Sequence, residues 1–194
     1  MNTIDKRLQP IVNYFLFFPK EASELQLLQE QLKTDSDMFN RKNYRGHITT
    51  SIALFEKASK EILLIHHIGL NDWIQPGGHF EDDKDLWVAA QRELQEETGI
   101  AKVDIVDWGQ YTMTIPFDIN THSIPANPNR GEGAHVHHDC LFLASVSKPK
   151  EIKQQVEEIK GFAWKPSSAD DISPRLRHVI SKANRLGILR YGIF

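Results

Sequence analysis

Three glutamates near the middle of the chain have a spacing that can bring their carboxylates together. Glu93, Glu96 and Glu97 stand at positions i, i+3 and i+4, so in a helix their side chains project from one side within about one 5.4 Å turn. Their charges repel one another, and near the C-terminus of a helix they also oppose the macrodipole. Oxygen ligands without Cys or His suit Mg²⁺, with Mn²⁺ as an alternative. We therefore expect a divalent-metal site; the simpler interpretation is a solvated acidic helix face.

A glycine turn lies upstream of these glutamates, in the stretch Pro76-Gly77-Gly78. Glycine has no Cβ atom, so backbone carbonyls and amides at such a turn can approach a metal or a phosphate closely. A glycine turn that leads into a helix with clustered carboxylates predicts a site for a metal-bound diphosphate.

The element that must position the glutamates is a helix, which we expect over residues 83–97. Leu86, Ala90 and Leu94 recur every four residues, so one face can pack while another stays polar. Gly99 is placed to end the helix as a C-terminal glycine.

The rest of the chain is predicted to form strands around this helix and a second helix at the end. Two neighbouring strands are expected over 48–55 and 61–65, because both stretches are rich in β-branched or aliphatic residues. Turn chemistry dominates 71–78, and a long loop is expected between the later strands. Ser173 has the position of an N-cap for a final helix that ends near residue 186. The later strands are expected over 103–115, 136–146 and 161–164.

Residues 1–44 form a predicted helical extension to a domain over 45–194. Pro19 is expected to separate two helices, because proline lacks a backbone donor. Leu25, Leu28 and Leu32 give the second helix one apolar stripe. This stripe must cover either the rest of the chain or a second copy, so a homodimer is one expectation.

The stretch from Gly78 to Ile100 resembles the signature of the Nudix hydrolases. That signature reads Gly-x5-Glu-x7-Arg-Glu-U-x-Glu-Glu-x-Gly-U, where U is an aliphatic residue. This chain has Gly78-x5-Lys84-x7-Arg92-Glu93-Leu94-x-Glu96-Glu97-x-Gly99-Ile100. Every defined position matches except Lys84. The resemblance implies the Nudix-type α/β/α sandwich with a mixed β-sheet, here preceded by the helical extension.

The resemblance also implies a Mg²⁺-dependent cleavage of the diphosphate bond in a nucleoside diphosphate linked to another moiety. The family's metal ligands correspond to Glu93, Glu96 and Glu97, assisted by the backbone carbonyl of Gly78. Glu96 and Glu97 are also the catalytic candidates within the box. A later glutamate can serve as the base instead, and Glu158 has a placement that resembles it.

Lys84 is the departure from the family pattern. The family has a structural glutamate there that pairs with the arginine matching Arg92, so Lys84 would meet Arg92 as a like charge. Asp83, Asp85 or Glu81 could take over the pairing, and Lys84→Glu is expected to stabilise the chain. The alternative function that Lys84 supports is a catalytically silent module that binds a nucleotide for regulation.

Four residues near the box are candidates for substrate binding. Trp73 lies beside the glycine turn and could stack on a base. His135 and His137 alternate on a predicted strand and would share a face, with His79, His122 and His138 near the same region. Such histidines suit a phosphate or ribose, an accessory transition metal, or an ordinary structural role. The candidates for substrate contact are Trp73, His79, His135 and His137.

Composition narrows the choice of partner. The formal net charge of the 194 residues is −3, so no broad basic surface is predicted and an extended nucleic acid is a poor fit. The apolar stretches are too short to cross a membrane. The single cysteine, Cys140, lies in an apolar run and is expected to be a buried strand residue. A cytoplasmic protein that acts on a small nucleotide-derived molecule is expected.

Overall fold

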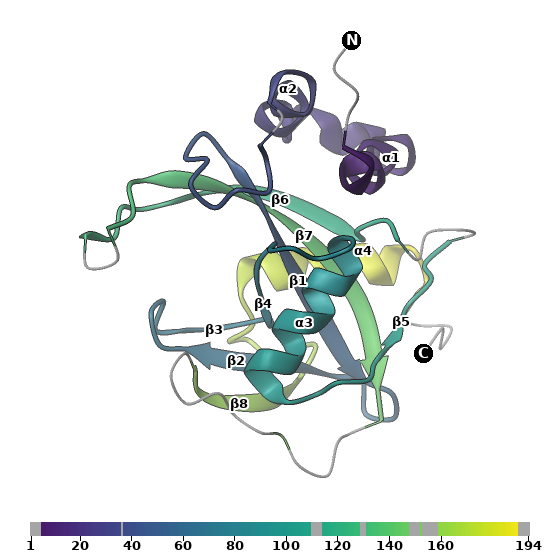
Figure 1. Cartoon of the computed structure of the whole chain (residues 1–194). Helices are drawn as coiled ribbons and strands as arrows, with labels where there is room; N and C mark the ends of the chain where they lie inside the picture. The colour runs from purple at the N-terminus through teal and green to yellow at the C-terminus, as the bar shows by residue number, and fades with distance from the viewer. Residues whose placement is uncertain are drawn as a thin grey trace.

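The computed structural model of the chain describes residues 5–35, 37–109, 114–128, 131–147, 152 and 159–189. A mixed β-sheet forms the centre (Figure 1). Its two central strands, β1 (His47–Glu56) and β7 (His135–Val146), run parallel, and the other pairings between described strands are antiparallel. Every residue of β1 is buried, as expected for a strand covered on both faces.

The remaining strands extend the sheet to either side of this pair. On the β1 side, β2 (Glu61–His67) pairs with β1, while β3 (Asp72–Ile74) and β8 (Ile159–Pro166) pair with β2. On the β7 side lie β5 (Asp104–Ile105) and β6 (Asp118–Ile124). The short strand β4 (Gly77–His79) pairs with the first half of β1.

Two helices cover opposite faces of the sheet, and alternation along β1 fills both interfaces. Figure 1 shows α3 (Leu86–Thr98) in front of the sheet and α4 (Pro174–Arg185) behind it. Ile48 and Ile52 join the core on the α3 side, whereas Ala53 and Phe55 join the core on the α4 side. Successive side chains of a strand point to opposite faces, which produces this division. The predicted α/β/α sandwich with a mixed sheet is confirmed.

The N-terminal helices pack on the α3 side and share its core. They comprise η1 (Lys6–Leu8), α1 (Gln9–Phe17), η2 (Pro19–Ser23) and α2 (Gln26–Thr34). Leu25, Leu28 and Leu32 are buried in the same apolar cluster as Ile48 of β1 and Leu94 of α3. The leucine stripe therefore covers the rest of this chain, and Pro19 separates two helices as predicted.

Polar contacts also connect this extension to the sheet. Gln31 of α2 is fully buried, accepts a hydrogen bond from His138 Nε2 of β7 at 2.9 Å and donates to the Gly46 carbonyl at 3.0 Å. Lys182 of α4, 2% exposed, donates to the Tyr14 hydroxyl of α1 at 2.8 Å. None of the described helices is both long and apolar enough to cross a membrane.

Most of the predicted elements are present, including the neighbouring first strands, the strand around 161–164 and the final helix capped by Ser173. Cys140 is buried in β7 as expected. The strand expected over 103–115 is wrong for most of the described part, because only Asp104–Ile105 pairs and Gly109 then turns back onto the Asp107 carboxylate.

Two stretches that were predicted as irregular contain strands. The loop expected between the later strands is wrong at its start, because β6 pairs with β7 from Asp118 to Ile124. Turn chemistry over 71–78 is interrupted by β3 and β4, which are short because the turn residues flank them.

Candidate functional site

The helix that carries the glutamates is defined at both ends by the sequence. Asp85 is the N-cap, and its carboxylate accepts a hydrogen bond from the Val88 amide at 2.9 Å. Gly99 ends the helix in the left-handed region with φ 73°, a conformation that glycine adopts without strain. The helix thus begins three residues later than the expected start at 83, because Asp83 and Lys84 precede the cap.

The glycine turn lies directly against the carboxylates of α3. The Gly77 amide donates to Glu97 Oε2 at 2.9 Å, and Glu97 is only 2% exposed. A Cβ atom added at Gly78 would lie 2.5 Å from the Glu93 carboxylate. Only glycine at position 78 lets Glu93 approach the backbone this closely. The structure therefore brings together Gly78, Glu93 and Glu97 from the predicted ligand set.

Arg92 connects two of the box glutamates to the turn. Its Nη1 donates to Glu93 Oε1 and to Glu96 Oε2, both at 3.0 Å, and its Nη2 donates to the His79 carbonyl at 2.8 Å. Asp83 takes the remaining side of the guanidinium, accepting from Nη2 at 3.0 Å and from Nε at 3.2 Å. Burial alone would lower the pKa of Arg92, but the hydrogen bond to Asp83 and the charge of Glu93 outweigh it and raise the pKa.

Asp83 thus fills the pairing role that the resemblance assigns to a glutamate at position 84. Lys84 is exposed, while the Asp83 side chain is 8% exposed and faces Arg92. Among the three carboxylates weighed as substitutes, Asp83 is the partner. The departure at Lys84 therefore leaves Arg92 paired.

The box glutamates differ in their access to solvent. The Glu93 side chain is 14% exposed and that of Glu96 is 50% exposed. Two of these carboxylates therefore lie inside the site, against the glycine turn, and Glu96 lies at its rim. Glu158, the expected alternative base, lies outside the described residues.

A group of histidines occupies the opposite face of the sheet from the box. Alternation along β4 directs Gly78 toward α3 and the next side chain, His79, the other way. His79 meets His137 of β7 with ring centroids 5.2 Å apart, and His135 Nε2 lies 3.1 Å from His137 Nε2. The prediction that His135 and His137 share a face is confirmed. His138 points to the other face, where it contacts Gln31.

These rings are poor bases in this setting. Burial, followed by the charge of neighbouring groups such as Arg41, lowers the pKa of His79 to about 4. Burial together with the surrounding imidazoles lowers the pKa of His137 to about 2. Both rings are therefore neutral near pH 7, with lone pairs available to accept a hydrogen bond or bind a metal.

His47, at the start of β1, joins this group, although it was not among the predicted site residues. Its Cα is the register partner of that of His137 in the parallel β1–β7 pair, and its ring stacks on that of His79 with centroids 5.2 Å apart. The parallel register brings these rings together, and nothing in the local sequence indicates that register.

Trp73 lies apart from the other substrate-binding candidates. Its ring contacts His66 of β2 edge-on at 5.1 Å, and Lys165 Nζ lies 4.9 Å from its centre. It packs beside the core on the α4 side. Trp87 packs on Phe142 with centroids 5.5 Å apart.

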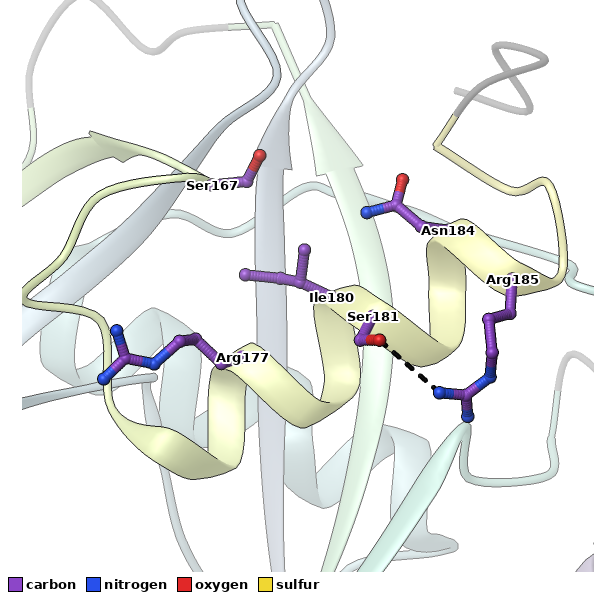
Figure 2. A pocket seen from close by; sticks show the side chains of 6 residues that line it. All are labelled: Ser167, Arg177, Ile180, Ser181, Asn184 and Arg185. Atoms are coloured by element: carbon purple, nitrogen blue, oxygen red, sulfur yellow. Dashed lines mark hydrogen bonds between the residues drawn. The ribbon is translucent and has the colours of Figure 1, made fainter.

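A surface hollow beside α4 contains none of the predicted site residues. Figure 2 shows its lining, with Arg185 donating to Ser181 one turn earlier on α4. No carboxylate or imidazole contributes to this lining, so the hollow is a poor candidate for metal chemistry. The lining residues are Ser167, Arg177, Ile180, Ser181, Asn184 and Arg185.

Comparison with known proteins matches the chain to one family. The family model for the NUDIX domain matches residues 46–182. The m7GpppN-mRNA hydrolase NUDT17 of Bos taurus is 29% identical over 104 residues, which cover 50% of this chain and 32% of that protein. An RNA pyrophosphohydrolase of Caulobacter vibrioides is 30% identical over 102 residues, which cover 52% of this chain and 58% of that protein. The matched region thus spans less than two thirds of either relative.

Solved structures show the same fold. A C. elegans Ap4A hydrolase binary complex superposes with a TM-score of 0.53 at 20% identity, covering 71% of this chain and 95% of that one. A NUDIX family hydrolase from Clostridium perfringens gives a TM-score of 0.52 at 22% identity, covering 76% and 99%. At these identities the likeness concerns the fold alone.

Proposed function

Because this chain belongs to the Nudix family, we propose that it is a Mg²⁺-dependent hydrolase that cleaves a diphosphate bond in a nucleoside diphosphate linked to another moiety. We assign this activity to a domain over residues 45–194, with 1–44 as an extension packed onto it. The lone buried Cys140 suits a reducing cytoplasm.

The contact between the glycine turn and the carboxylates of α3 carries the proposal. Gly78 permits the close approach of Glu93, and the Gly77 amide fixes Glu97 at 2.9 Å. These groups supply hard oxygen ligands of the kind that Mg²⁺ takes, with coordination positions left for water and for substrate phosphate oxygens. The residues therefore fit the metal that the family implies. Gly78, Glu93, Glu96 and Glu97 are the proposed ligands.

Bound Mg²⁺ would supply charge neutralisation of the diphosphate and a lowered pKa of a coordinated water. Side chains of the protein position the carboxylates that would bind the metal. Arg92 fixes the Glu93 and Glu96 carboxylates through one nitrogen at 3.0 Å from each. Glu96, half-exposed at the rim, is the box carboxylate best placed to accept a proton from the attacking water. Glu158 is the competing candidate for this base, and Glu97 is assigned to holding the metal.

The names of the relatives support a nucleotide-derived substrate class. Two of them are named as an m7GpppN-mRNA hydrolase and an RNA pyrophosphohydrolase. We propose that the substrate is a small nucleotide-derived molecule that contains a diphosphate bond. His79, His135 and His137 are the proposed contacts for its polar groups, and Trp73 for a base.

A metal-dependent substrate screen tests the proposal. The chain would be incubated with Mg²⁺ and with nucleotide sugars, ADP-ribose, dinucleoside polyphosphates, CDP-alcohols, NTPs and capped RNA, and the products identified by mass. We expect one class to be cleaved at its diphosphate, with the activity lost on chelation. Binding of a nucleotide without turnover in any class would favour the silent regulatory module. The pairing of Arg92 with Asp83 argues against that module. Asp83 gives Arg92 the carboxylate partner that is missing at position 84, where this chain has Lys84.

A further inference from the structure

The three histidines His47, His79 and His137 form a cluster with the arrangement of a metal site. They come from three different strands, and one ring nitrogen of each lies within 4.8 Å of the others. Two ligands of a tetrahedral ion are about 3.3 Å apart, given bonds of about 2.0 Å. A bound ion would therefore draw the nitrogens closer together than they are without it.

His47 provides the strongest indication of a ligand. Its Nδ1 lies 3.1 Å from the Asn43 carbonyl, so Nδ1 carries the proton and Nε2 keeps its lone pair. Among the residues that the structure describes, this Nε2 atom has no hydrogen-bond partner, and it is buried in a residue that is 1% exposed. A buried acceptor without a partner has lost its hydrogen bond to water and gained nothing in return. In metal-bound histidines, one ring nitrogen typically donates its proton to a backbone carbonyl, and the lone pair of the other nitrogen binds the metal.

The surroundings are compatible with a cation. The three rings lie in direct contact, with that of His79 5.2 Å from those of both His47 and His137 between centroids. Arg41 and Glu132 are the charged side chains whose fields act on His47 and His79. They pair with each other at 2.7 Å, so they add little net charge. His135 lies beside His137 and stacks on Tyr44, which places a further imidazole at the edge of the cluster.

We propose that His47, His79 and His137 bind a divalent transition-metal ion such as Zn²⁺, at a site separate from the box glutamates. Imidazole nitrogens suit first-row transition metals, whereas the glutamates suit Mg²⁺. The two sites lie on opposite faces of β4, since Gly78 faces Glu93 and His79 faces His137. Three protein ligands leave one coordination position open, as in zinc sites that bind water or a ligand.

Metal titration of the full chain tests this site. The protein is stripped with a chelator, dialysed, and titrated with Zn²⁺ in competition with a chromophoric chelator, with excess Mg²⁺ present to occupy the box glutamates. Co²⁺ replaces Zn²⁺ in a parallel experiment, because tetrahedral and octahedral Co²⁺ differ strongly in visible absorption. We expect one ion bound with a tetrahedral Co²⁺ spectrum. Neither readout depends on hydrolysis, so failure here is distinguishable from failure of the proposed hydrolase.

Matched variants assign the ion to these ligands. His47→Gln and His137→Gln should weaken Zn²⁺ binding by at least about 100-fold, which exceeds the typical effect of losing an outer-shell partner. Glu93→Gln should leave this ion in place. His178→Gln is the control, because it removes a histidine on α4 that is 54% exposed and outside the cluster.

A second variant keeps the test decisive if loss of the buried His47 lowers the melting temperature too far. His79→Gln alters a less buried ring and should also abolish the tetrahedral spectrum. Zn²⁺ binding that survives all the histidine variants, or that disappears only in Glu93→Gln, would overturn the proposal.

Discussion

At the scale of single residues, the exposure of the box glutamates separates roles that their spacing alone leaves equal. Glu97 is 2% exposed and engaged with the Gly77 amide, whereas half of the Glu96 side chain is open to solvent. The i, i+3, i+4 pattern predicted that the three carboxylates share one side of a helix. Their different depths depend on where the glycine turn lies, which no local spacing encodes.

Glu97→Gln should remove most of the turnover while leaving the fold intact. Glutamine keeps one acceptor oxygen for the Gly77 amide, but the negative charge that would bind the metal is lost. We expect kcat on the best substrate to fall by about 100-fold or more, with an unchanged melting temperature. Glu30→Gln is the matched control, because Glu30 is an exposed glutamate 3.7 Å from Arg45. Undiminished turnover in Glu97→Gln would remove the metal assignment.

The Arg92–Asp83 pair leads to a revised expectation for Lys84. Arg92 is already satisfied by Asp83, and Lys84 is exposed, so Lys84→Glu should change the free energy of unfolding by less than about 0.5 kcal/mol. Asp83→Asn should cost about 1–3 kcal/mol, because it weakens charge-assisted hydrogen bonds to a partly buried guanidinium.

A double variant checks the same reasoning by chemical denaturation. Adding Lys84→Glu to Asp83→Asn should restore part of the loss, since it recreates the pairing that the family uses. Equal stability of Asp83→Asn and the original chain would show that Asp83 does not support Arg92.

At the scale of elements, helices with clear caps and buried strands with continuous apolar runs could be predicted from the sequence. Asp85 and Gly99 define α3, and Ser173 defines the start of α4. The strand β6 could not, because Asn120 and Ser123 are typical of loops. It exists because β7 offers it a pairing partner along its whole length, which is a tertiary effect that overrides local propensity.

The same limit applies to His47. Its neighbours along the chain indicate a strand, and they contain no further histidine. The cluster arises only when the parallel register aligns His47 with His137 and β4 adds His79. A site assembled from three strands is invisible to any local pattern.

The two glycines of the turn should respond differently to alanine, because their neighbours differ. A Cβ at Gly77 would lie 2.4 Å from the Thr50 carbonyl and 2.7 Å from the Ser51 Cα, so backbone must move. A Cβ at Gly78 would meet the Glu93 carboxylate, the end of a flexible side chain that can swing away. We expect Gly77→Ala to lower stability by about 1–3 kcal/mol.

Gly78→Ala should retain most of the stability and lose activity instead, by at least about 10-fold, because Glu93 is displaced from the site. Thermal melts and kcat/KM of both variants make the comparison. A Gly78→Ala enzyme with normal kcat/KM would show that the position of Glu93 against the turn is not needed.

At the scale of the whole molecule, the N-terminal extension is continuous with the core of the domain that it was expected to accompany. The sequence predicted its helices and its leucine stripe but left open what the stripe covers. Leu28 is fully buried against the α3 side of the sheet. Polar contacts from α1 and α2 reach β6, β7 and α4, so the extension and the domain should unfold together.

Substitution of Lys182 tests whether the N-terminal extension and the domain unfold together. Its Nζ, in a side chain 2% exposed, contacts Glu21 at 2.9 Å and Asp118 at 3.3 Å, and lies 3.6 Å from the centre of the Phe18 ring. It therefore joins α4 to the N-terminal extension and to β6. Lys182→Met keeps most of the volume but leaves Asp118, 3% exposed, with less positive charge to offset its burial.

Removal of one partner from a buried ion pair typically costs about 3–5 kcal/mol, and we expect the lower end because Arg175 also contacts Asp118 at 3.2 Å. For a chain of this size that corresponds to a fall in melting temperature of roughly 6–12 °C. Lys165→Met is the matched control, because it removes a lysine paired with Asp171, whose side chain is 60% exposed, and should cost at most about 1 kcal/mol. A single cooperative transition, shifted downward in Lys182→Met, is expected if the extension and the domain fold as one unit. Equal melting temperatures for the two lysine variants, or a separate early transition in the original chain, would contradict that view.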